Sequence, residues 1–92
     1  MKIYYIRDCV SGAGSDLIQE RSDESFIRGF GYSIVNQDLP PKLRCDLVGV
    51  CLGELIDNPG GYPFIKAYEA PVPVCSGQDA YLSVSDGGDS NG

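Results

Sequence analysis

The sequence contains no histidine, and this absence removes the commonest general base of enzymes. Without histidine there is no Ser-His or Cys-His nucleophile pair, which argues strongly against hydrolase chemistry. Gly12 and Gly14 lack the Gly-Lys-Ser/Thr ending of a phosphate loop, so a flexible turn is expected there rather than a nucleotide site. We therefore expect a protein that is not an enzyme and has no catalytic residues.

Paired cysteines are also missing. The chain has four cysteines, Cys9, Cys45, Cys51 and Cys75, and no two of them form a Cys-x-x-Cys pair. Two disulfides and a four-thiolate zinc site are the alternatives, but a zinc site without a paired knuckle is unusual. Free thiols that pack as small hydrophobic groups in a reducing compartment are the expected state. We expect no metal and no other cofactor.

No run of apolar residues approaches the roughly 18 that a membrane span needs, so no membrane is expected among the partners. The first residues, "MKIYYIRD", lack the apolar core and cleavage site of a signal peptide, which makes a cytoplasm the expected compartment. Basic residues are absent after Lys66, whereas four acids follow it. Residues 1–66 carry 7 basic and 9 acidic side chains, so most of the net charge of −6 belongs to the C-terminal end.

Local patterns predict a small number of elements. Residues 2–7 are β-branched and aromatic and predict a strand, and residues 17–21 predict a short second strand or an edge. Residues 21–37 predict a helix with Ser22 or Asp23 as N-cap and one apolar stripe, Phe26, Ile27, Phe30 and Ile34. Two adjacent prolines then predict a connector over residues 38–45.

Residues 46–68 predict a β-hairpin around the turn "DNPGG". Both alternating sets of its first strand are small or apolar, which is typical of a central strand covered on both faces. We expect Val48, Val50, Leu52 and Ile56 to face the helix, with Glu54 at the frayed end of that set or displaced by a bulge. Asp46 and Asp57 would lie about 36 Å apart at ~3.3 Å per residue, too far for a shared metal site.

The end of the chain predicts less structure. Residues 70–75 are an extended Pro-rich segment, and residues 76–92 are expected to form an acidic, Gly- and Ser-rich tail in which residues 80–84 either form a short strand or dock on a partner. The last eight residues are expected to be mobile. The predicted fold is therefore α+β: residues 1–75 form a small antiparallel sheet of three to four strands with one helix packed on a face.

Over residues 1–70 the chain resembles the small nonstructural protein family of gokushoviruses, microviruses with circular single-stranded DNA genomes. The resemblance rests on the order and spacing of "MKIYYIRD", "SDESFIRGF" and "DLVGVCLGELIDNPGG". It implies a bacteriophage accessory protein in the host cytoplasm. Members of the family are thought to act in DNA binding or in the switch to single-stranded genome synthesis, so single-stranded DNA or a viral or host replication protein is the implied partner.

Two functional hypotheses follow, from different classes. For DNA binding, the candidate phosphate contacts are Arg7, Arg28, Lys42, Arg44 and Lys66, and the candidate stacking surfaces include Tyr62 and Tyr68. Arg28 is the favoured single candidate, because it lies opposite or beside the apolar stripe of the helix. The alternative is a protein-binding module, a homodimeric adaptor or an inhibitor of a host protein, because a thin domain can cover its second sheet face by dimerising.

Overall fold

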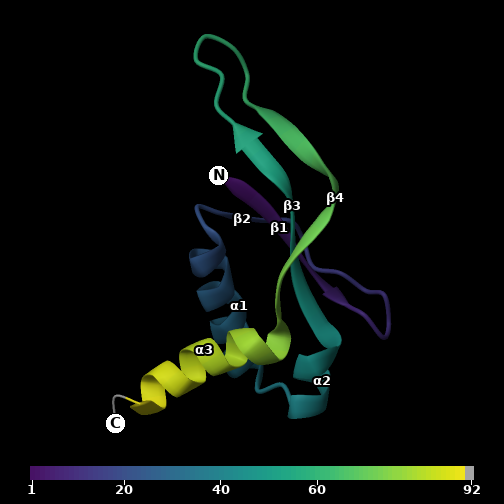
Figure 1. Ribbon diagram of the computed structural model, residues 1–92, viewed down its shortest axis with the longest axis vertical. Coiled ribbons are helices and arrows are strands. Elements are labelled where there is room, and N and C mark those ends of the chain that lie inside the picture. Colours follow the sequence, from purple (N-terminus) through teal and green to yellow (C-terminus); the bar gives the residue numbers. More distant parts are fainter. Residues whose placement is uncertain (91–92) are drawn as a thin grey trace.

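The computed structural model describes residues 1–90, with side chains as far as residue 85, and contains one sheet and three helices in that range. The elements are β1 (Lys2–Asp8), β2 (Ile18–Glu20), α1 (Asp23–Gln37), α2 (Pro41–Asp46), β3 (Leu47–Ile56), β4 (Phe64–Ser76) and α3 (Gly77–Ser90). The strands are ordered β2-β1-β3-β4, and every neighbouring pair is antiparallel. Figure 1 shows α1 and α3 together on one side of this sheet. The α+β prediction is confirmed, and the structure adds two helices to the one expected.

Helix α1 begins and ends as its sequence dictates. The Ser22 hydroxyl accepts a hydrogen bond from the Ser25 backbone N–H at 3.2 Å, which confirms Ser22 as the N-cap. At the other end Asp38 adopts the left-handed conformation, with φ of 52°, and its N–H bonds to the carbonyls of Ile34 and Val35. Phe26, Phe30 and Ile34 are fully buried, so the apolar stripe packs on the sheet as expected.

The orientation predicted for β3 is wrong. Gly49 and Cys51 face the helix, whereas Val48, Val50 and Leu52 point to the opposite side, and Gly53 lies against the β4 backbone. The cause is the size of the α1 aromatics: a Cβ at Gly49 would lie 2.7 Å from the Phe26 Cζ atom. A larger side chain at Gly49 is therefore excluded by the Phe26 and Phe30 rings.

The core is thin and one-sided. It is a cluster built around the Tyr4 and Phe26 rings, which stack with centroids 4.3 Å apart and nearly parallel planes. Phe30, Ile34, Cys51 and Ala80 complete the buried cluster. All of these side chains lie between the sheet and the helices, so the stabilising apolar contacts of the fold are concentrated on one face of the sheet.

Two segments expected to be irregular are helical. Within the predicted connector, Pro41 begins α2, because a proline is tolerated at the first helical position, where its missing N–H costs nothing. The predicted strand at 80–84 is also wrong, since these residues lie in α3. Ser76 accepts a hydrogen bond from the Asp79 N–H at 3.0 Å and starts the helix. Residues 91–92 and the side chains of 86–90 lie outside the described residues, as does much of the mobility predicted for 85–92.

Helix α3 is held by its first two turns. Ala80 is fully buried against α1, where a Cβ at Gly31 would overlap the Ala80 carbonyl oxygen. The Arg44 guanidinium lies over the Tyr81 ring, 3.7 Å from its centroid, and donates to the Gln78 Oε1 at 3.0 Å. These tertiary contacts stabilise a segment whose Gly- and Ser-rich sequence has low helix propensity.

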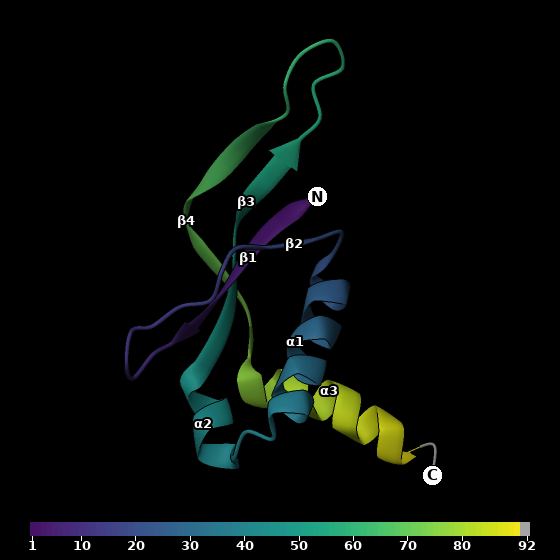
Figure 2. The ribbon, with the colours of Figure 1, turned by 180° about the vertical axis from the view of Figure 1, so that it is seen from behind.

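The far ends of β3 and β4 form a hairpin arm, residues 55–66, that extends beyond the body of the domain (Figure 1). The pairs Leu55–Ile65 and Ile56–Phe64 continue the ladder into this arm. The same arm projects when the molecule is seen from behind (Figure 2), and the longest dimension of the molecule is 48 Å. The arm is held by its own ladder and has little of the core behind it.

Candidate functional site

The five predicted phosphate-binding residues are dispersed over the molecule. Arg28 is exposed on α1 and forms an ion pair with Glu24 at 3.5 Å. Arg44 binds Tyr81, Gln78 and the Leu39 carbonyl within the chain. The remaining three are exposed on three different elements: Arg7 on β1, Lys42 on α2 and Lys66 on β4. The structure therefore does not bring these five side chains into one groove.

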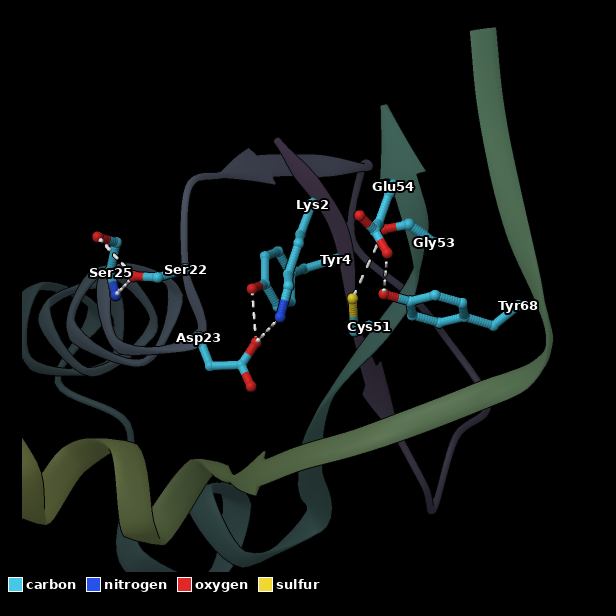
Figure 3. Close-up of polar contacts among 9 residues, drawn as sticks. All are labelled: Lys2, Tyr4, Ser22, Asp23, Ser25, Cys51, Gly53, Glu54 and Tyr68. Carbon is cyan, nitrogen blue, oxygen red and sulfur yellow. Dashed lines mark hydrogen bonds and ion pairs between the residues drawn. The ribbon is translucent and has the colours of Figure 1, made fainter. Parts of the chain in front are cut away.

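The two predicted stacking residues have different surroundings. Tyr62 is 90% exposed near the tip of the hairpin arm. Tyr68 lies on β4 against the core cluster, and its hydroxyl donates to the Glu54 Oε2 at 3.2 Å (Figure 3). Desolvation, together with the neighbouring Cys51 and Glu54, raises the pKa of Tyr68 to about 12. The Tyr68 ring is therefore held by packing within the domain, and of the two only Tyr62 has a ring that is exposed for stacking on a base.

Asp46 and Asp57, the carboxylates weighed above for a shared metal site, are separated along the chain. Asp46 ends α2, and Asp57 follows the last residue of β3, so the whole length of that strand lies between them. The Glu54 carboxylate accepts a hydrogen bond from the Tyr68 hydroxyl. The strand register shifts between Cys51 and Gly53, just before Glu54, as it does at a β-bulge. No cluster of three or more potential metal ligands occurs among the residues that the structure describes.

The side of the sheet opposite α1 and α3 carries a continuous apolar surface. We call it the outer face, and it is formed by Tyr5, Val48, Val50, Leu52, Pro71 and Pro73. These residues line a groove of about 440 Å³, and no described helix covers it. A sheet face with this composition is normally packed against another surface, because its burial is favourable by roughly 25 cal/mol per Å².

Strand pairing aligns the residues of the outer face in rows across the sheet. Tyr5 pairs with Val50, which pairs with Pro73, and Arg7 pairs with Val48, which pairs with Ser76. Tyr5 also lies over Gly14, where any Cβ would overlap the tyrosine ring. The small residue at Gly14 lets this ring lie along the sheet, and it extends the outer face toward the loop after β1.

The placement of glycines on β3 is a signal in the sequence for this face. Of the two alternating sets on β3, one contains Gly49 and Gly53, and the other contains the branched residues Val48, Val50, Leu52 and Ile56 together with Glu54. Glycine in a central strand indicates close approach by another element. Because the neighbouring helix carries two phenylalanines, the glycine set should face it and the branched set should remain for the outer face.

The edges of the sheet are poorly suited to strand addition. β4 forms one edge and contains Pro71 and Pro73, which have no N–H to donate. The other edge, β2, is only three residues long. Short edge strands and edge prolines protect a sheet from further pairing, so the face is the more accessible surface for association.

The thiols add no covalent link to this arrangement. All four cysteines are free: Cys9 and Cys45 are exposed, Cys51 is buried in the core, and Cys75 is half-buried. Burial, with the nearby charges of Asp79 and Asp23, raises the pKa of Cys75 to about 11. Cys51 donates a weak hydrogen bond to the Gly53 carbonyl at 3.7 Å (Figure 3).

In addition to the Cys75 thiol, the buried Tyr4 makes the stability of the fold sensitive to alkaline pH. The Tyr4 hydroxyl donates to the Asp23 Oδ1 at 2.7 Å, and Lys2 lies 3.6 Å from the same oxygen (Figure 3). Burial raises the pKa of Tyr4 far above its usual value of 10.0, and the bond to Asp23 raises it further. The protonated hydroxyl is therefore the form that the folded state requires.

We expect the free energy of unfolding to fall as the pH rises above about 9. Below that pH the folded and unfolded chains are both protonated at Cys75 and Tyr4, and the stability from these groups is fully present. Above it the unfolded chain releases protons first, at 9.0 for the thiol and 10.0 for the tyrosine, while the folded chain retains them. Each proton so released lowers stability by about 1.4 kcal/mol per pH unit.

Urea unfolding at a series of pH values measures this effect. Tyr4→Phe should be less stable at neutral pH by about 1 kcal/mol, through loss of the bond to Asp23, but its stability should fall less steeply above pH 10. Tyr62→Phe, at a 90% exposed position, is the matched control and should leave the slope unchanged. Equal slopes for Tyr4→Phe and the wild type would contradict the assignment.

None of the helices in the described part of the chain is both long and apolar enough to cross a membrane. Comparison of the chain with protein-family models, with curated proteins and with solved structures found no match.

Proposed function

We propose that this protein is a non-enzymatic binding module and that it binds another protein through the outer face of its sheet. The observation that carries the proposal is the apolar groove of about 440 Å³ on a face that no described helix covers. On the resemblance alone, we also propose that the binding takes place in the cytoplasm of a bacterium infected by a microvirus.

The dispersion of the basic residues favours a protein over single-stranded DNA as the partner. A single strand is held by a positively charged groove that follows its backbone and by aromatic rings on which successive bases stack. Here Arg28 pairs with Glu24 and Arg44 lies over the Tyr81 ring, while the exposed Tyr62 belongs to the hairpin arm, which extends away from the helices that carry these arginines (Figure 1). The outer face itself has the apolar composition of a protein interface core.

Photo-crosslinking from the outer face tests the proposal. A photoreactive amino acid at Val50, in the full chain expressed in a bacterium, should give an adduct that protease destroys and nuclease leaves intact. The same amino acid at Lys42, exposed on α2, is the matched control and should give little adduct. An adduct that nuclease removes, or a yield at Val50 no higher than at Lys42, would contradict the proposal.

A mobility-shift assay addresses the DNA hypothesis directly. At physiological salt the proposal expects no retained complex with single-stranded DNA, since non-specific binding is typically weak, with Kd of roughly 10⁻⁴ to 10⁻⁶ M. A complex that persists at this salt, and that weakens when Arg28 is changed to Ala, would favour the DNA hypothesis instead.

A further inference from the structure

We propose that the occupant of the outer face is a second copy of this chain, packed face to face across a twofold axis. The inference rests on the proposed function for the position of the site and adds the identity of the partner. A twofold interface must be self-complementary, because the same surface lies on both sides of it. The outer face meets this requirement through an uncharged centre and opposite charges at opposite corners.

The centre of the face is apolar on each of its three strands. Tyr5, Val50 and Pro73 form one row across β1, β3 and β4. Leu52 and Pro71 lie beside this row and line the same groove. Two such surfaces can interdigitate as the inner faces of packed sheets do, about 10 Å apart.

A positive charge occupies one corner. Arg7 lines the groove at the end of β1, in the row that continues through Val48 to Ser76. It is exposed, and among the described residues that line the groove it is the one charged side chain. Arg7 would be a buried, unpaired charge in any face-to-face complex that did not supply an acid for it.

A negative charge occupies the diagonally opposite corner. The β3–β4 register shifts beside this segment, but Tyr68 packs against the core on the helix side and Pro71 lines the groove, so alternation between these two fixed positions puts the exposed Glu69 on the outer face. Glu69 is seven residues along β4 from Ser76, at the far end of the face from the row that contains Arg7. The two charges therefore lie on different strands, β1 and β4, and at opposite ends of the outer face.

A twofold axis along the other diagonal brings these corners together. Rotation about that axis places Arg7 of one copy on Glu69 of the second copy, and it does so twice in the dimer. Strands of the two sheets would then cross at a steep angle, as in orthogonally packed sheets. The second copy thus supplies an acidic side chain for each Arg7. A single-stranded nucleic acid would instead meet only one basic side chain, Arg7, on this face, and its phosphates would be repelled by Glu69.

Exchange of the two charges tests this geometry in the full chain. Sedimentation equilibrium over a wide range of concentration should show a dimer for the wild type. Arg7→Glu and Glu69→Arg should each raise the dimer dissociation constant by roughly a hundredfold, because each puts like charges at two contacts. The double variant should restore the dimer to within about tenfold of the wild type, since opposite charges meet again.

Controls separate this inference from the function on which it rests. Lys42→Glu is the matched charge reversal on α2 and should leave dimerisation unchanged. Circular dichroism should show the same fold in every variant, since Arg7 and Glu69 are both exposed. A dimer that none of the charge changes affects, or a double variant no better than the singles, would overturn the inference.

A monomeric wild type would also overturn it. In that case a Val50 adduct with a different protein would leave the proposed function standing, because the face would have another occupant. An adduct of twice the chain mass supports both statements. No Val50 adduct would remove both.

Discussion

Replacing Phe26 with alanine should lower the free energy of unfolding by about 3–5 kcal/mol. Phe26 is 1% exposed, stacks on Tyr4 with centroids 4.3 Å apart, and fills the space left by Gly49. The substitution removes this ring from the middle of the one-sided core and leaves a cavity between α1 and the sheet. For a domain of this size, total stability is typically 5–15 kcal/mol, so the loss would be a large share of the whole.

Urea unfolding followed by circular dichroism measures this loss. Val35→Ala, on the same helix and 44% exposed, is the matched control and should change stability by about 0.5 kcal/mol or less. If Phe26→Ala were no more destabilising than Val35→Ala, the core would not be where the structure places it.

Two glycines on α1 should respond to alanine in opposite directions, and this is the second large effect. Gly31→Ala should destabilise the protein by about 1–3 kcal/mol, since the new methyl group would overlap the Ala80 carbonyl and force α3 away. Gly29→Ala should stabilise it by up to ~1 kcal/mol, because its methyl group would have only Glu20 at 3.9 Å and alanine favours the helix.

The pair serves as its own control, because the same chemical change is made two residues apart on one helix. Thermal unfolding gives the sign of each effect, and amide hydrogen exchange in residues 77–85 reports whether α3 has separated. Stabilisation by both substitutions would show that α3 does not pack on α1 at Gly31.

The sequence predicted α1 and its cap because their determinants are local. Ser22, the acids of the first turn and the spacing of the phenylalanines all lie within one short segment. The hairpin was predictable for the same reason, since its turn residues are adjacent. Helix α3 was not predictable from local sequence, because its stability depends on Gly31 and Arg44, which are remote along the chain.

In the candidate site, too, local sequence identified the residue types, whereas contacts between remote residues decided their roles. Charge and residue type identified Arg7 and Arg44 equally as phosphate contacts, but only the structure distinguishes them. Arg44 is bound to Tyr81 and Gln78, more than thirty residues away, whereas Arg7 is exposed beside an apolar groove. The outer face was misassigned because both alternating sets on β3 are small or apolar, so the pleat alone does not say which set faces the helix.

The hairpin arm has a consequence for how the chain can vary in length. Residues 57–63 connect β3 to β4 and are exposed throughout, with Gly60 in a positive-φ turn at the tip. Peptide inserted or removed at this tip would alter no packing in the body, because closing a longer loop costs only about 0.6 kcal/mol per doubling. The reach of the arm can therefore diverge among related chains while the folded body stays the same.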